Sequence, residues 1–110
     1  MAYTVNNKTK KITLVKGDTL KMQIEILVDG EVYTPTENDV IKFAMKQSYA
    51  SPSIMVQKII PNNTLILKLD SIDTKNLISD KYVYDIEITF ENGDVDTFIR
   101  GEIELLPEVG

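Results

Sequence analysis

KYVYDIEITFENGDVDTFIR, residues 81–100, is the most strongly patterned segment of this chain. Its first half carries apolar side chains at every second position: Tyr82, Tyr84, Ile86, Ile88 and Phe90. This period of two puts an apolar row on one face of a strand and a mostly polar row on the other. Asn92-Gly93 follows, and both residues tolerate the positive φ angles of a tight reversal. The segment therefore predicts antiparallel strands over 81–90 and 95–105, joined by a turn.

Similar alternation recurs earlier in the chain. It predicts strands over residues 11–15, 19–28, 31–33, 40–46, 54–60 and 64–69. Asp29-Gly30 has the composition of a two-residue hairpin turn. Asp73 is suited to cap a short helical turn near 73–78, over residues 74–77.

About seven strands with turns every 8 to 12 residues predict an all-β fold, an antiparallel immunoglobulin-like β-sandwich. Tyr84, just after a short turn, is placed like the tyrosine corner of such sandwiches. A compact barrel of similar strand count is the structural alternative. The expected organisation is a flexible N-terminal arm (1–10), one sandwich domain (11–106) and a C-terminal tail (107–110). The predicted core residues are Leu20, Met22, Ile24, Ile26, Leu67, Tyr84, Ile86, Ile88, Ile99 and Ile103.

The composition argues against several classes of function. The 110 residues include no Cys, His or Trp, and the net charge is −5. Without Cys or His there is no thiolate nucleophile and no side chain that normally titrates near neutrality, so we expect no enzyme, no metal centre and no cofactor. Arg100 is the single arginine, and the acidic balance argues against nucleic-acid binding. No segment has the length and apolarity of a membrane span or a signal peptide, which predicts a protein made in the cytoplasm.

Two acidic groups could in principle carry chemistry. Glu91, Asp94 and Asp96 flank the Asn92-Gly93 turn and offer hard oxygen ligands for calcium, but without EF-hand spacing. Asp85 and Glu87 have the separation of a glycosidase carboxylate pair. Nothing in the sequence supplies a cleft beside them, so solvated polar surface is the preferred interpretation of both groups.

Phe98 interrupts the polar face expected for the last strand. It lies between Asp96 and Arg100, on what the alternation predicts to be the outer face. An aromatic side chain in that position is either an isolated surface residue or the centre of a subunit contact. We favour the contact, and Phe98, Arg100 and Asp96 are the predicted interface residues.

An ordered set of short motifs resembles a known family. The motifs are Val15-Lys-Gly-Asp-Thr19, Asp29-Gly-Glu-Val-Tyr-Thr-Pro35, Asp39-Val-Ile-Lys-Phe-Ala-Met-Lys46, Asp73-Thr-Lys-Asn-Leu77, Lys81-Tyr-Val-Tyr-Asp85 and Asn92-Gly-Asp-Val-Asp-Thr97. In this order they resemble the small immunoglobulin-like β-sandwich structural proteins of tailed bacteriophages and prophages of Gram-positive bacteria. They are similar to the N-terminal domain of upper baseplate proteins.

The resemblance implies a virion structural protein without catalytic residues. It would belong to the tail, the baseplate or the head, with other virion proteins as partners and a homo-oligomeric state in the particle. The alternative is a carbohydrate-binding or adhesion module of a host-recognition apparatus. That class usually needs aromatic platforms, and this chain has no Trp and 7% aromatic residues.

Overall fold

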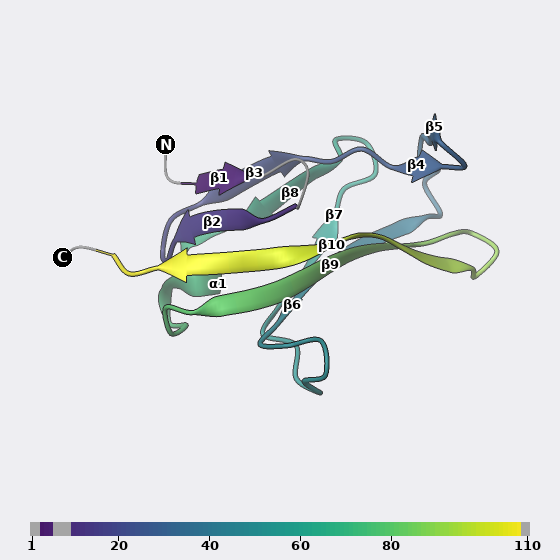
Figure 1. Ribbon diagram of the computed structural model, residues 1–110. Helices are drawn as coiled ribbons and strands as arrows, with labels where there is room; N and C mark the ends of the chain where they lie inside the picture. The colour runs from purple at the N-terminus through teal and green to yellow at the C-terminus, as the bar shows by residue number, and fades with distance from the viewer. Residues whose placement is uncertain (1–2, 6–9, 109–110) are drawn as a thin grey trace.

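A computed structural model describes residues 3–5 and 10–108 of the protein. The described chain is mostly β-strand (Figure 1). One curled sheet contains six strands, in the order β1 (Tyr3–Val5), β2 (Ile12–Val15), β10 (Val95–Leu106), β9 (Lys81–Thr89), β6 (Val40–Lys46) and β7 (Val56–Ile60). Two smaller sheets pair β3 (Leu20–Gln23) with β8 (Ile66–Leu69), and β4 (Leu27–Val28) with β5 (Glu31–Val32). A short helix, α1 (Ser71–Lys75), connects β8 to β9.

The predicted all-β class is confirmed, but the large sheet is mixed rather than antiparallel. β10 pairs with β9 in antiparallel fashion and with β2 in parallel, so that Ile103 lies beside Ile12 and Leu106 beside Val15. Parallel neighbours require a crossover connection between them. Here β2 and β10 lie near opposite ends of the chain, and most of the domain forms that connection.

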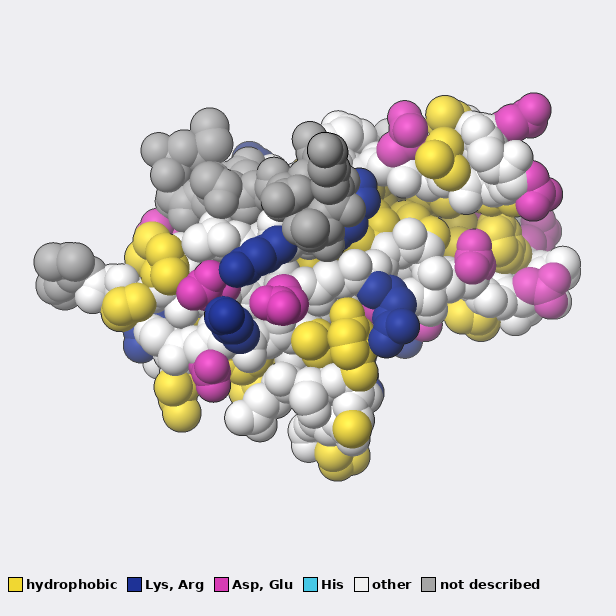
Figure 2. Space-filling model, viewed as in Figure 1, with side chains coloured by type: hydrophobic (Ala, Val, Ile, Leu, Met, Phe, Trp, Pro, Cys, Tyr) yellow, Lys and Arg dark blue, Asp and Glu magenta, His cyan; other side chains and the backbone are white. Residues whose placement is uncertain are grey.

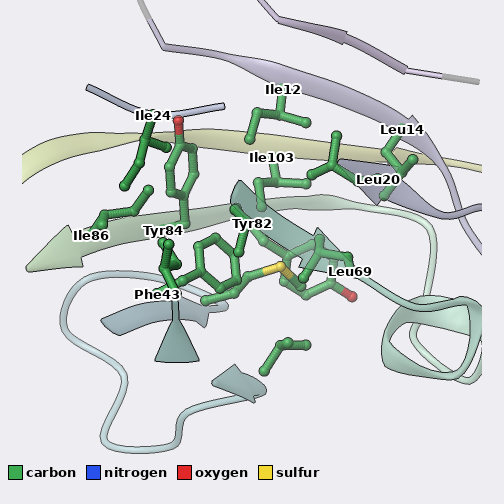
Figure 3. Close-up of a cluster of buried hydrophobic side chains, with 14 of the residues drawn as sticks. Ile12, Leu14, Leu20, Ile24, Phe43, Leu69, Tyr82, Tyr84, Ile86 and Ile103 are labelled. Carbon is green, nitrogen blue, oxygen red and sulfur yellow. The ribbon is translucent and has the colours of Figure 1, made fainter. Parts of the chain in front are cut away.

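The core lies between the curled sheet and the β3–β8 pair (Figure 3). Apolar residues of β2, β6, β9 and β10 meet Leu20, Leu67 and Leu69 from the smaller sheet. The rings of Phe43 and Tyr84 pack with their centroids 5.6 Å apart. Eight of the ten predicted core residues are buried, and the other two, Met22 and Ile99, are half-buried against the cluster.

The long strand predicted over residues 19–28 is divided in two. β3 pairs with β8 only as far as Gln23, after which the Ile24 amide donates to the carbonyl of Leu65 at 2.9 Å. The Ile26 carbonyl accepts from the Tyr33 amide instead, and β4 then turns into β5. The turn is Asp29-Gly30, with φ angles of 53° and 82°, which confirms the predicted hairpin.

The helical turn begins earlier than its sequence predicted. Asp70, not Asp73, occupies the N-cap position. Asp73 lies in the first turn, where its carboxylate accepts from the Asp70 amide at 2.7 Å and pairs with Lys58 at 2.9 Å. An aspartate three residues inside a helix can satisfy the amide of the capping residue, which is why Asp73 resembled a cap in the sequence.

Part of the predicted N-terminal arm is a strand. Tyr3–Val5 pairs with β2 in antiparallel fashion as β1, at one edge of the large sheet. The other residues of the predicted arm, apart from Lys10, lie outside the described residues. Pro107 and Glu108 follow β10 without regular structure, and the last two residues of the predicted tail are also outside the described part.

Candidate functional site

β10 contains a bulge at Phe98. The pairing with β9 shifts register between Thr97 and Ile99, because Thr97 lies opposite Glu87 while Ile99 lies opposite Ile86. Phe98 is the extra residue, and such bulges re-aim side chains and strengthen the local twist. Both Phe98 and Ile99 are half-buried and pack against the core.

The bulge separates the three predicted interface residues. The placement of Phe98 on the outer face is wrong, since the side chain packs inward. Asp96 lies opposite Ile88, a buried residue, so it is on the core-facing side of the sheet near an exposed end. Arg100 lies opposite Asp85 and is exposed on the other face. A sequence-based count of alternating positions fails here because it assumes an unbroken period of two.

Phe98 forms part of a groove that no sequence motif had indicated. One wall carries Met22, Ile24 and Leu27, and the opposite wall carries Phe98 and Ile99. Tyr84 and Lys10 also line the groove, whose volume is about 370 Å³. Figure 2 shows an apolar hollow between two lobes, which Figure 1 identifies as the β4–β5 hairpin and the turn between β9 and β10. The groove exists because the chain leaves β8 after Gln23 while β10 bulges toward it.

Beside this groove, no strand of the described residues covers the edge of β10. β9 covers one edge of β10, whereas β2 runs along the other edge only from Ile103 to Leu106. Among the described residues, no backbone hydrogen bond reaches the remaining part of that edge, from Val95 to Gly101. Such an edge is a template for pairing with another strand.

Alternation identifies which backbone groups face the open edge. The Leu106 carbonyl accepts from the Lys16 amide, so the backbone groups of Leu106 face the β2 side. In a strand the backbone groups of every second residue face the same edge. The amide and carbonyl of Arg100 therefore face that edge as well. Beyond the bulge, the Asp94 carbonyl accepts from the Phe90 amide on the β9 side. Backbone groups alternate between the two edges along a strand, and Thr97 lies an odd number of residues after Asp94. The Thr97 amide and carbonyl therefore face away from β9, toward the open edge.

Acidic side chains surround the outer end of the groove. Glu25, Asp29 and Glu31 are exposed on the side of β4 and β5, and Glu91, Asp94 and Asp96 are exposed on the side of β9 and β10. The sequence contains no Lys or Arg between Lys21 and Lys42, or between Lys81 and Arg100. Figure 2 shows acidic groups on both lobes beside the apolar hollow. This end of the molecule has a negative potential around an apolar centre.

On the opposite face of β10, Arg100 is held by Tyr49. The guanidinium carbon lies 4.2 Å from the centroid of the Tyr49 ring, which is a cation–π contact. The Tyr49 hydroxyl donates to the carbonyls of Gly101 and Tyr84, at 3.2 and 3.3 Å. The ring of Tyr49 is therefore fixed in place and covered on one side by the arginine.

Asp39 is a buried carboxylate beside the same end of the molecule. It accepts hydrogen bonds from the Tyr33 hydroxyl at 2.5 Å, the Thr36 amide at 2.9 Å and the Glu91 amide at 3.0 Å. The hydrogen bond from Tyr33 lowers the pKa of Asp39, against the opposing effect of burial, and the backbone donors lower it further. A carboxylate occupied in this way cross-links two loops and has little capacity left for substrate.

The acidic groups considered for chemistry have other roles in the fold. The Asp94 backbone amide donates to the side-chain oxygen of Asn92 at 2.9 Å, and the Asn92 side-chain amide donates back to the Asp94 carboxylate at 3.2 Å, which closes the turn. Glu87 pairs with Lys42 of the neighbouring strand at 3.2 Å. Within residues 3–5 and 10–108, no three acidic side chains gather in a way that could hold a metal ion, and no helix has the length and apolarity to cross a membrane.

Comparison of the chain with protein-family models, with curated proteins and with solved structures gives no match.

Proposed function

We propose that this protein is a structural component of a bacteriophage or prophage particle, where it binds other virion proteins as an assembly module of the tail, the baseplate or the head. The observation that carries the proposal is the apolar groove beside the part of the β10 edge that no described strand covers. A groove of this kind offers apolar contacts and unsatisfied backbone groups together, which suits the recognition of another polypeptide.

The arrangement of strands supports an immunoglobulin-like fold for this module. β6, β9 and β10 are adjacent, as the C, F and G strands are in immunoglobulin domains, and β3 pairs with β8 as B does with E. The Tyr82 hydroxyl donates to the carbonyl of Ile78 at 2.6 Å, at the start of β9. That is the geometry of a tyrosine corner, made by Tyr82 rather than by Tyr84 as the sequence had suggested.

A rigid β-domain suits particle assembly for a physical reason. Its binding surface is already ordered, so association costs little conformational entropy. In a symmetric particle many copies engage at once, and weak individual contacts become strong in combination.

The carbohydrate-binding alternative receives less support from the surface. Sugar sites use exposed aromatic faces, and Tyr49 is the exposed aromatic side chain within residues 10–108. Its ring is stacked under Arg100 and its hydroxyl is bonded to the backbone. The groove, by contrast, is lined mainly by aliphatic and polar side chains, and its two aromatic residues are the buried Tyr84 and the half-buried Phe98.

The proposal is tested by inducing particles from a bacterium that carries the gene and purifying them through a density gradient. Mass spectrometry should find this protein co-purifying with the major head and tail proteins at a constant ratio across the particle peak. Deletion of the gene should yield incomplete particles, visible by electron microscopy, that the gene in trans restores. Absence of the protein from intact particles, together with normal particles from the deletion strain, would reject the virion role.

A further inference from the structure

The groove has the properties of a binding site for one kind of polypeptide. Its walls come from Met22, Ile24 and Leu27 on one side and Phe98 and Ile99 on the other. Along one wall runs the part of the β10 edge that no described strand covers, with the backbone groups of Thr97 and Arg100 directed toward the groove. An extended segment placed there would bond to this edge while every second side chain entered the apolar space.

The charge around the groove selects among extended segments. Six exposed acids lie at its outer end, three on each lobe, and the surrounding sequence contains no base over residues 22–41 and 82–99. Lys10, at the groove itself, is the basic residue among those that line it. An acidic partner would be repelled at this end, whereas a basic partner would be attracted and oriented.

We infer that the groove binds an extended, cationic segment of another protein, which adds as a strand to the edge of β10. Valine-like side chains at alternate positions enter the groove, and Lys or Arg side chains reach Glu25 and Asp96 at its rim. The inference rests on the proposed role as an assembly module and names the chemistry of the partner.

The first measurement uses a designed probe. The blocked peptide Lys-Val-Lys-Val-Lys-Val-Lys is titrated into the full chain by isothermal calorimetry at low salt, and Glu-Val-Glu-Val-Glu-Val-Glu serves as the matched control. The lysine peptide should bind at least tenfold more tightly than the glutamate peptide, and its affinity should fall as salt rises. Equal binding of the two peptides, or no binding of the lysine peptide at millimolar concentration, overturns the inference.

The second measurement separates strand addition from simple charge attraction. Proline at position 97 removes the amide that faces the groove without removing a bond to β9, so Thr97→Pro should weaken the lysine peptide about tenfold or more, while the matched control Thr97→Val retains the amide and the affinity. A lysine peptide N-methylated at its valines makes the same test on the wild-type chain, in case Thr97→Pro does not fold. Unchanged affinity for the N-methylated peptide overturns strand addition.

The location is tested by two-dimensional NMR of the labelled chain. Shift changes should concentrate in residues 22–27 and 95–99, with slower amide exchange at Thr97 on binding. Changes centred on Tyr49 and the outer face would assign the peptide elsewhere and overturn the inference. So would concentration-dependent dimerisation of the wild-type chain through the same residues, since the groove would then bind a second copy.

These outcomes are independent of the virion experiment. If the protein binds the lysine peptide in the groove but is absent from particles, the inferred binding is supported and the proposed virion role is rejected. If the protein is present in particles but does not bind the peptide, the proposed virion role is supported and the inferred binding of a cationic strand is rejected.

Discussion

The hydroxyl of Tyr84 donates a hydrogen bond of 2.6 Å to the backbone carbonyl of Lys10, on a segment 74 residues earlier in the chain. Burial raises the pKa of Tyr84 to about 12, so the hydroxyl remains a donor throughout the physiological range. Gly101 makes this approach possible. A Cβ atom at that position would lie 2.6 Å from the Lys10 carbonyl oxygen and 3.0 Å from the Tyr84 ring.

Replacement of Gly101 by alanine should therefore destabilise the fold. The added methyl group meets backbone, which cannot swing aside as a flexible side chain could, and we expect a loss of about 1 to 3 kcal/mol in the free energy of unfolding. Urea denaturation followed by circular dichroism measures the loss. Glu102→Ala, at the exposed neighbouring position, is the control and should change stability by less than about 0.5 kcal/mol. Equal stabilities of the two variants would show that Lys10 does not approach the sheet this closely.

Ile86 tests the position of the core. It is fully buried in β9, opposite the bulge of β10, and truncation to alanine should cost roughly 2 to 5 kcal/mol through lost burial and a residual cavity. Ile59→Ala is the matched control, because that side chain is 61% exposed on β7. Thermal and urea unfolding of both variants provide the comparison. A loss below about 1 kcal/mol for Ile86→Ala would contradict a core at this site.

Asp39 should make the free energy of unfolding depend on pH in the acidic range. Its pKa in the fold lies below the ordinary value of 3.8, so the unfolded chain takes up a proton at higher pH than the folded chain does. The stabilisation is complete above the unfolded value and is lost as the pH falls through the folded value. Asp39→Asn should thus be less stable than the wild type at pH 7, with a difference that narrows below about pH 4.

The measurement is the urea midpoint of wild type and Asp39→Asn at several pH values between 2 and 7. Glu37→Gln, in the same loop but exposed, controls for a general effect of removing an acid. A constant difference between wild type and Asp39→Asn at all pH values would mean that the carboxylate is not held in its charged form by Tyr33, Thr36 and Glu91.

Phe98→Asp is expected to have a different effect from the one its sequence suggested. A residue on the outer face would accept the charge without loss of stability, whereas the half-buried Phe98 packs on the core beside Ile99. We expect a clear loss of stability, because the new carboxylate would be partly withdrawn from water without a partner. Asp96→Asn, two residues earlier and exposed, should unfold like the wild type.

The predicted contact of this strand with another copy or another virion protein remains a prediction, which variants of Asp96 and Arg100 test. Light scattering compares the masses of wild type and Asp96→Asn at high concentration, and particle assembly is scored with Arg100→Ala. A wild type that remains monomeric, with normal assembly of both variants, would exclude Asp96 and Arg100 from a contact.

The sequence predicted those parts of the fold that depend on local pattern. Alternation located β9, and Asp29-Gly30 located the hairpin between β4 and β5, because strand facing and turn geometry are set by neighbouring residues. The candidate groove was not predictable in this way. It depends on the bulge at Phe98 and on the departure of the chain from β8 after Gln23, and both arise from tertiary packing. A signal existed in Phe98 itself, an aromatic residue out of phase with its strand, but the sequence could not distinguish an exposed contact from a bulge.

The parallel pairing of β2 with β10 has a consequence for how the protein is made. Ile103 is synthesised long after its partner Ile12. β2 is therefore made well before β10, and this part of the large sheet cannot form until β10 has been synthesised. Contacts between such distant positions raise the contact order, which slows folding to the millisecond-to-second range typical of β-domains. The nascent chain is thus most vulnerable to mispairing along the edge of β2 that β10 covers, before β10 emerges.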